Sequence, residues 1–173
     1  MFKKTICVAS SIFMLATASV AYGDIVTEPK IGYQVELPEG FVAVKGRAGL
    51  PSGESETDTR YAGFVLIGIP ANGPKLKDAR SEPDFTSHMG SCAKEFTNET
   101  ANSIDIECVN YQGDKGAEMI VRHLHEVHNC EAETTLAMIE FVFFMGAPGT
   151  KEDFIHEGRE TAQEIFSTLK PCK

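Results

Sequence analysis

Residues 103–145 read SIDIECVNYQGDKGAEMIVRHLHEVHNCEAETTLAMIEFVFFM, and this stretch decides the fold. Apolar and acidic side chains alternate over 103–111, which is the period of a strand with one buried face and one solvated face. Two further strands are expected at 117–127 and 134–145, because turn-forming residues separate them from each other and from the first strand. Three successive strands joined by short turns predict an antiparallel sheet.

Three more strands are expected upstream, at 31–37, 41–45 and 61–69. The last of these is nearly all apolar, which predicts a buried strand in the middle of the sheet. The intervening segment at 46–60, GRAGLPSGESETDTR, has no apolar periodicity and is rich in Gly, Ser and acidic residues. This composition predicts a loop.

Apolar residues recur at helical spacing in two segments, 83–96 and 150–169. The second helix has a capping signal, because Thr150 is followed three residues later by Asp153. The order of elements is therefore β-β-β-α-β-β-β-α. This order predicts an α+β fold in which two helices pack against an antiparallel sheet of about six strands.

Residues 1–23 are expected to form a bacterial secretory signal peptide. Lysines at positions 3 and 4 precede an apolar run at 6–20, and cleavage is expected near Gly23, with Ala21 as the alternative. An uncleaved anchor is the competing interpretation, but the run is shorter than the roughly 20 residues that a spanning helix needs. Residues 24–173 are therefore expected to form a single α+β domain without a membrane span, in the periplasm or secreted.

The composition narrows the choice of partner. The 173 residues are 24% charged and 42% hydrophobic, which is typical of one soluble domain. The 25 acidic residues outnumber the 16 basic ones, and the formal net charge is −9. Loss of the two signal-peptide lysines takes this charge to −11. Nucleic-acid binding needs clustered Lys and Arg, so no nucleic-acid partner is expected.

The cysteines predict two disulfides. Cys7 lies before the apolar core of the signal peptide and leaves with it, so four cysteines stay in the mature chain: Cys92, Cys108, Cys130 and Cys172. An even number in an exported chain indicates disulfides rather than free thiols, and the lack of a C-x-x-C pair disfavours metal ligation by thiolates. Of three possible connectivities we favour Cys92–Cys108 with Cys130–Cys172, because Cys92 and Cys108 are both expected on inward faces.

Residues 33–41, YQVELPEGF, form a strand followed by a proline, a short turn and an aromatic residue. This opening and the closing amphipathic helix at 154–169 resemble PsbP/Mog1-like domains over about residues 28–170. The resemblance implies an α/β/α sandwich that serves as a binding scaffold, and it carries over no catalytic residue. Two disulfides depart from the usual pattern of these domains. Exported bacterial domains of this shape include immunity proteins that neutralise periplasmic toxins, so the resemblance also implies immunity.

One dense histidine cluster supports an alternative function. His123 and His125 are two residues apart on an expected strand, so they share one face, and His128 at its end could supply a third ligand. Imidazoles in this arrangement can bind Zn²⁺ or Cu²⁺. The zinc-protease spacing is absent. A half-exposed strand that happens to contain histidines is the competing interpretation.

Glu54, Glu56 and Asp58 lie in the expected loop at 46–60. On a chain of this charge they could meet a basic protein, since complementary charge speeds encounter and fixes orientation. The competing interpretation is a solvated loop that only increases solubility.

No nucleophile elbow or phosphate-binding glycine motif is present, and the paired carboxylates Glu54, Glu56 and Asp58 sit in an expected loop, which lacks the rigidity that catalytic acids need. No catalytic residue and no cofactor are therefore expected, and an envelope hydrolase is a minor alternative. The sequence favours an exported, periplasmic protein-binding module, most concretely an immunity or inhibitor protein. It would block a basic cell-envelope toxin or hydrolase by occluding the active site. The alternative is a metal-binding periplasmic protein that uses the histidine cluster.

Overall fold

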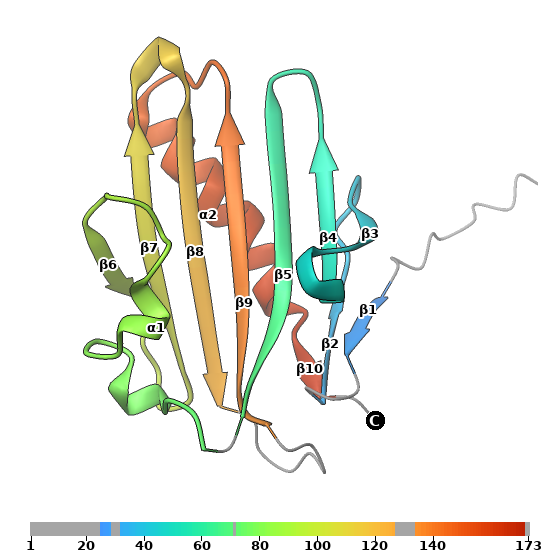
Figure 1. Ribbon diagram of the computed structural model, residues 1–173. Coiled ribbons are helices and arrows are strands. Elements are labelled where there is room, and N and C mark those ends of the chain that lie inside the picture. Colours follow the sequence, from blue (N-terminus) through green and yellow to red (C-terminus); the bar gives the residue numbers. More distant parts are fainter. Residues whose placement is uncertain (1–24, 29–31, 71, 127–133, 172–173) are drawn as a thin grey trace, which may run out of the picture.

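The computed structural model describes residues 25–28, 32–70, 72–126 and 134–171 (Figure 1). The predicted signal peptide, the predicted disulfide partners Cys130 and Cys172, and His128 lie outside the described residues. No helix in the described part of the chain is long and apolar enough to cross a membrane.

A seven-stranded antiparallel sheet organises the chain, with strand order β3-β4-β5-β9-β8-β7-β6. Its strands are β3 (Val42–Lys45), β4 (Pro51–Glu56), β5 (Arg60–Pro70), β6 (Lys94–Thr97), β7 (Ser103–Tyr111), β8 (Ala117–Glu126) and β9 (Thr134–Met145). The three successive strands predicted at 103–145 are confirmed as β7, β8 and β9, and the α+β class is confirmed with them. β5 pairs with β9 in continuous register from Tyr61↔Phe144 to Ile69↔Leu136, at the centre of the sheet.

A second sheet of three strands joins the two ends of the described chain. It consists of β1 (Ile25–Glu28), β2 (Tyr33–Glu36) and β10 (Lys170–Pro171). The backbone N–H of Glu36 donates a hydrogen bond of 3.0 Å to the Thr168 hydroxyl, and the Glu36 carboxylate pairs with the Lys170 ammonium. The predicted number of strands, about six in one sheet, was therefore too low.

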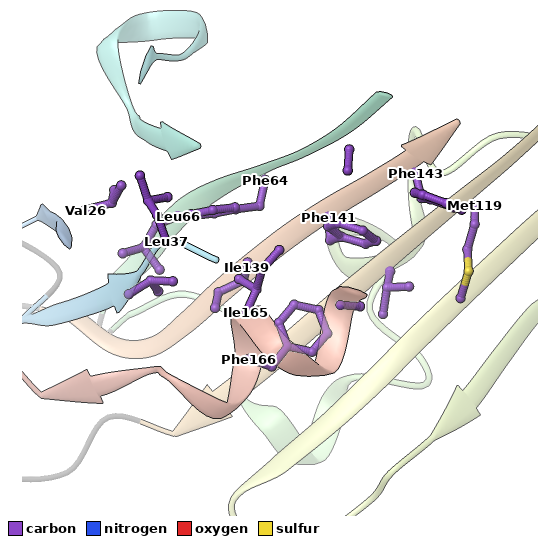
Figure 2. Packing of buried hydrophobic residues seen from close by; sticks show 14 of the residues in the cluster. Val26, Leu37, Phe64, Leu66, Met119, Ile139, Phe141, Phe143, Ile165 and Phe166 are labelled. Atoms are coloured by element: carbon purple, nitrogen blue, oxygen red, sulfur yellow. The ribbon is translucent and has the colours of Figure 1, made fainter. Parts of the chain in front are cut away.

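The helix α2 (Lys151–Ser167) covers one face of the large sheet (Figure 1). The Thr150 hydroxyl accepts a hydrogen bond of 3.1 Å from the Asp153 N–H, which confirms the predicted helix start. Ile165 and Phe166 pack against the sheet in the larger apolar cluster (Figure 2). Phe154 belongs to the same cluster. A Cβ atom at Gly158 would lie 2.7 Å from the sulfur of Met119 and 3.0 Å from Phe143 Cδ1, so any larger residue would force these side chains to shift.

The opposite face is covered over only part of its width. The predicted helix at 83–96 was largely wrong, because α1 (Pro83–Thr86) is a single turn and the chain then leaves the helical conformation. His88 and Gly90 have positive φ angles of 62° and 87°, which break a helix. Phe85 and Met89 are nevertheless buried as the apolar pattern predicted, in a second core cluster with residues of β7, β8 and β9.

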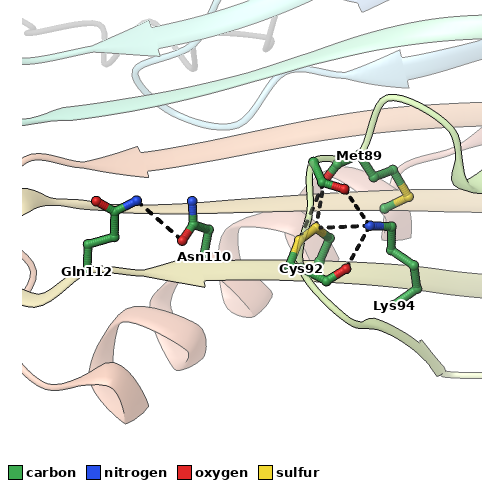
Figure 3. Close-up of a disulfide and its surroundings, with 7 residues drawn as sticks. Met89, Cys92, Lys94, Asn110 and Gln112 are labelled. Atoms are coloured by element: carbon green, nitrogen blue, oxygen red, sulfur yellow. Dashed lines mark hydrogen bonds between the residues drawn. A yellow bond between two sulfur atoms is a disulfide. The ribbon is translucent and has the colours of Figure 1, made fainter.

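One predicted disulfide, Cys92–Cys108, is present, with its Cα atoms 5.5 Å apart. It joins the loop after α1 to β7, so Cys92 lies in a loop and not on a helix. The Lys94 ammonium donates to the carbonyl oxygens of Gly90 and Cys92, at 2.7 and 2.8 Å (Figure 3). The other predicted pair, Cys130–Cys172, lies outside the described residues.

Two further expectations were wrong. The segment 46–60 is not one loop, because it forms a short 3₁₀ helix at Arg47–Gly49 and the strand β4. The face of β7 expected to be solvated is covered by α2, and Asp105 and Glu107 there are only 1% and 3% exposed. Alternation alone cannot distinguish acids in water from acids paired beneath a helix.

We expect the variant Cys92→Ala/Cys108→Ala to unfold at a lower urea concentration than the wild-type protein. The two cysteines are 16 positions apart. Closing a loop of that size lowers the entropy of the unfolded chain and stabilises the fold by about 3 kcal/mol. The control is to repeat both unfolding curves with a reducing agent, because this shows separately how much any other disulfide stabilises the fold. Equal unfolding midpoints under oxidising conditions would show that this bridge does not stabilise the fold.

Candidate functional site

The part of the sheet that the α1 region leaves uncovered contains an open cavity of about 570 Å³. We call it the β4–β5–β9 trough, after the strands that form most of it. Its side chains include Val44, Leu50, Glu54, Tyr61, Val65, Ile67, Glu140 and Val142. The volume lies within the range of roughly 300–1,000 Å³ that is usual for ligand sites, and an apolar floor with few polar groups is also typical of them.

Tyr61 lies flat across the neighbouring residue Gly63 on the trough side of β5. A Cβ atom at Gly63 would come within 2.8 Å of Tyr61 Cζ and 3.1 Å of Cε1, so the ring occupies the space of the missing side chain. Glu54 is the partner of Gly63 in the β4–β5 register. The Glu54 carboxylate is close enough for its negative charge to act on the Tyr61 hydroxyl.

The surroundings of Tyr61 raise the pKa of its hydroxyl above 10.0. Burial is the largest cause, followed by the negative charges of Glu54 and Glu56 and the hydrogen bond to Glu54. Each of these favours the neutral phenol over the phenolate. The phenol of Tyr61 is therefore uncharged at neutral pH and retains its hydroxyl proton beside Glu54.

Glu54 and Glu56, both predicted to bind a partner, are brought together on β4, not on a loop. They are two residues apart, so both side chains lie on the trough side of the sheet. Asp58 lies in the exposed turn between β4 and β5 and does not line the trough. Among the described side chains, no Lys, Arg or His forms an ion pair with any of these three carboxylates.

Glu140, on the other side of the trough, is neutralised by a buried arginine. Arg122 Nε and Nη2 lie 2.7 and 2.6 Å from Glu140 Oε2. Arg122 Nη1 also donates to the carbonyl oxygen of Phe85, at 2.9 Å. The same guanidinium therefore holds α1 on the sheet and compensates the charge of Glu140.

The sequence did not assign Tyr61 and Glu140 to a site. The sequence does mark Glu140, because it is the only charged residue in the strand β9. No sequence feature marks Tyr61, since its role depends on strand register with Glu54 and Gly63.

His123 and His125 share one face of β8, as predicted, and their ring centroids are 5.9 Å apart. That face lies towards α2. His123 Nδ1 is 2.6 Å from Asp105 Oδ1, and the His123 ring stacks on Phe166 at 4.8 Å between centroids. In the described part of the chain, no three His, Cys, Asp or Glu side chains form a group that could hold a metal ion. Because His128 lies outside it, metal binding stays a prediction.

A second polar contact lies beside these histidines. Arg159 of α2 binds the buried Glu107 carboxylate through Nε and Nη2, at 3.0 and 2.6 Å. The hydrogen bond to Glu107 is the main reason that the pKa of Arg159 is raised. Thr97 Oγ1 donates to the same carboxylate at 3.1 Å. This pairing explains how an acid can lie beneath α2.

Removing the cation should reveal this role of Arg159. We expect Arg159→Met to lower the free energy of unfolding by about 2 kcal/mol, because it leaves the buried Glu107 without its charge partner, although solvent partly screens the half-exposed Arg159. The control is Glu99→Gln, which breaks the exposed Arg80–Glu99 pair of 2.6 Å and should cost about 1 kcal/mol or less. The measurement is urea unfolding, and equal losses in the two variants would contradict the prediction.

Glu54→Gln should lower the pKa of Tyr61, since it removes a negative charge and weakens a hydrogen bond that favours the phenol. Because the folded-state pKa is raised, Tyr61 stabilises the fold fully below pH 10 and loses this contribution as the pH rises through the folded value. Ultraviolet titration of tyrosinate measures the shift, and Tyr61→Phe identifies its signal. Asp58→Asn is the matched control, and a shift as large in that variant would contradict the assignment.

Comparison with known proteins places the chain in no family: no protein-family model matches it, and no curated protein matches its sequence.

Proposed function

We propose that the protein is an exported protein-binding module, an immunity or inhibitor protein that blocks a basic toxin or hydrolase of the bacterial cell envelope. The β4–β5–β9 trough is its binding surface. The observation that carries the proposal is an open apolar trough beside Glu54 and Glu56, which no described cation neutralises. A basic partner would bury the trough and pair both charges.

Exposed apolar side chains extend this surface on both sides. Val42 on β3 is 56% exposed and is the register partner of Glu54. Phe144 on β9 is 43% exposed and is the register partner of Tyr61. Apolar groups that continue from a trough onto its rim are typical of protein interaction sites, where a partner supplies the missing cover.

The charge of the chain supports the same partner. A net charge of −9, with acids on the binding face, attracts a basic protein and speeds its encounter. Inhibition then needs only occlusion of the partner's active site. The resemblance to PsbP/Mog1-like domains is consistent with this role, because exported domains of that shape include immunity proteins.

The test is capture of periplasmic proteins on three immobilised forms of residues 24–173. These are the wild type, the charge reversal Glu54→Lys/Glu56→Lys, and the matched reversal Glu160→Lys/Glu164→Lys on the exposed side of α2. We expect a basic protein to bind the wild type and the α2 variant, and to bind the β4 variant at least tenfold more weakly. The association rate should fall with added salt.

The captured protein must also lose its enzymatic or toxic activity when the wild-type chain is added. Equal capture by all three forms, or binding that leaves the partner fully active, would contradict the proposed function. Loss of capture by both charge reversals would point to nonspecific attraction between opposite charges.

A further inference from the structure

The trough contains an aromatic ring that lies against a strand. Because Gly63 has no side chain, the Tyr61 ring packs over β5, and Tyr61 lines the trough. The face of an aromatic ring attracts cations, through the negative charge of its π-system. The close packing of the ring over Gly63 restricts its position.

A carboxylate with spare capacity adjoins this ring. An ionised carboxylate such as that of Glu54 has about four lone-pair positions that can accept hydrogen bonds. Glu56, the register partner of Tyr61, adds a second negative charge beside the ring. Neither acid forms an ion pair with a described cation. The space above the ring therefore has a negative potential.

The rest of the trough is apolar. Val65 and Val142 form its floor beyond the ring, and Leu50 lines it from the side of the 3₁₀ helix. Such a surface suits the methylene stem of a long basic side chain, whose charged head reaches a polar end. An anionic or a purely apolar occupant would leave the charges of Glu54 and Glu56 uncompensated.

We propose that the trough binds an arginine side chain of the partner. Its guanidinium stacks on the Tyr61 ring and donates to Glu54, and its stem lies over Val65 and Val142. A planar cation with a fork of N–H donors fits an aromatic face beside a carboxylate better than the ammonium of lysine does. The identity of the partner rests on the proposed function, whereas the arginine site can be tested without any partner.

The probe is N-acetyl-arginine amide, titrated into the folded protein and followed by NMR chemical shifts. We expect saturable binding with shifts at Tyr61, Gly63 and Val65. The neutral isostere N-acetyl-citrulline amide should bind at least tenfold more weakly, and the lysine analogue at least threefold more weakly. The bound cation should also lower the pKa of Tyr61, because it offsets the negative charges that raise it.

Variants then locate the site. Glu54→Gln and Tyr61→Leu should each weaken binding of the arginine probe at least fivefold. Gly63→Ala should weaken it too, because its methyl group displaces the ring. Glu164→Gln, on the exposed side of α2, is the control and should bind as the wild type does. Circular dichroism confirms that each variant is folded.

Equal binding of the arginine and citrulline probes, or no effect of Glu54→Gln, would overturn the arginine site. Absence of saturable binding in the folded wild type would overturn it as well. If the probe binds but no basic protein is captured, the proposed function fails and the arginine site stands. If a partner is captured through β4 but the probe does not bind, the arginine site alone fails.

Discussion

The register between β5 and β9 is the constraint on which the core and the trough both depend. It places Phe64 opposite Phe141 and Leu66 opposite Ile139, on the face that α2 covers. The alternate residues of the same strands, among them Tyr61 and Glu140, then face the trough. A slip of one residue would exchange the two sets, moving phenylalanines into water and an acid under the helix. The packing of the core therefore determines which residues face the trough, although the trough residues contribute little to the packing of the core.

The two faces of the sheet differ because their covers differ in length. The 17 residues of α2 extend across the sheet, whereas the single turn of α1 and its loops cover only the side nearer β7. Closing the trough would bury more apolar surface and stabilise the fold. A chain that leaves Val42 and Phe144 exposed has kept a surface that folding alone does not require.

The positions of β7, β8, β9 and α2 could be predicted from the sequence, although the alternation in β7 did not reveal that its acidic face is buried. The region after Pro83 could not be predicted, because Phe85 and Met89 are buried by a loop that turns at two residues with positive φ. β4 was missed because its polar face lies along an open trough, so its sequence has the composition of a loop. Glu54 was found from charge alone, but its pairing with Tyr61 follows from strand register, which no local pattern contains.

The two acidic sides of the trough are chemically unequal, and Arg122 is the reason. Glu140 receives two contacts from that guanidinium, so its charge is compensated inside the protein. Glu54 forms no ion pair with a cation in the described part of the chain, so no such partner compensates its charge there. A bound segment would therefore place its cation at the β4 side and a neutral or apolar group near Glu140. The two sides of the trough therefore differ in charge. Arg122 causes this difference, and it also holds α1 through the carbonyl of Phe85.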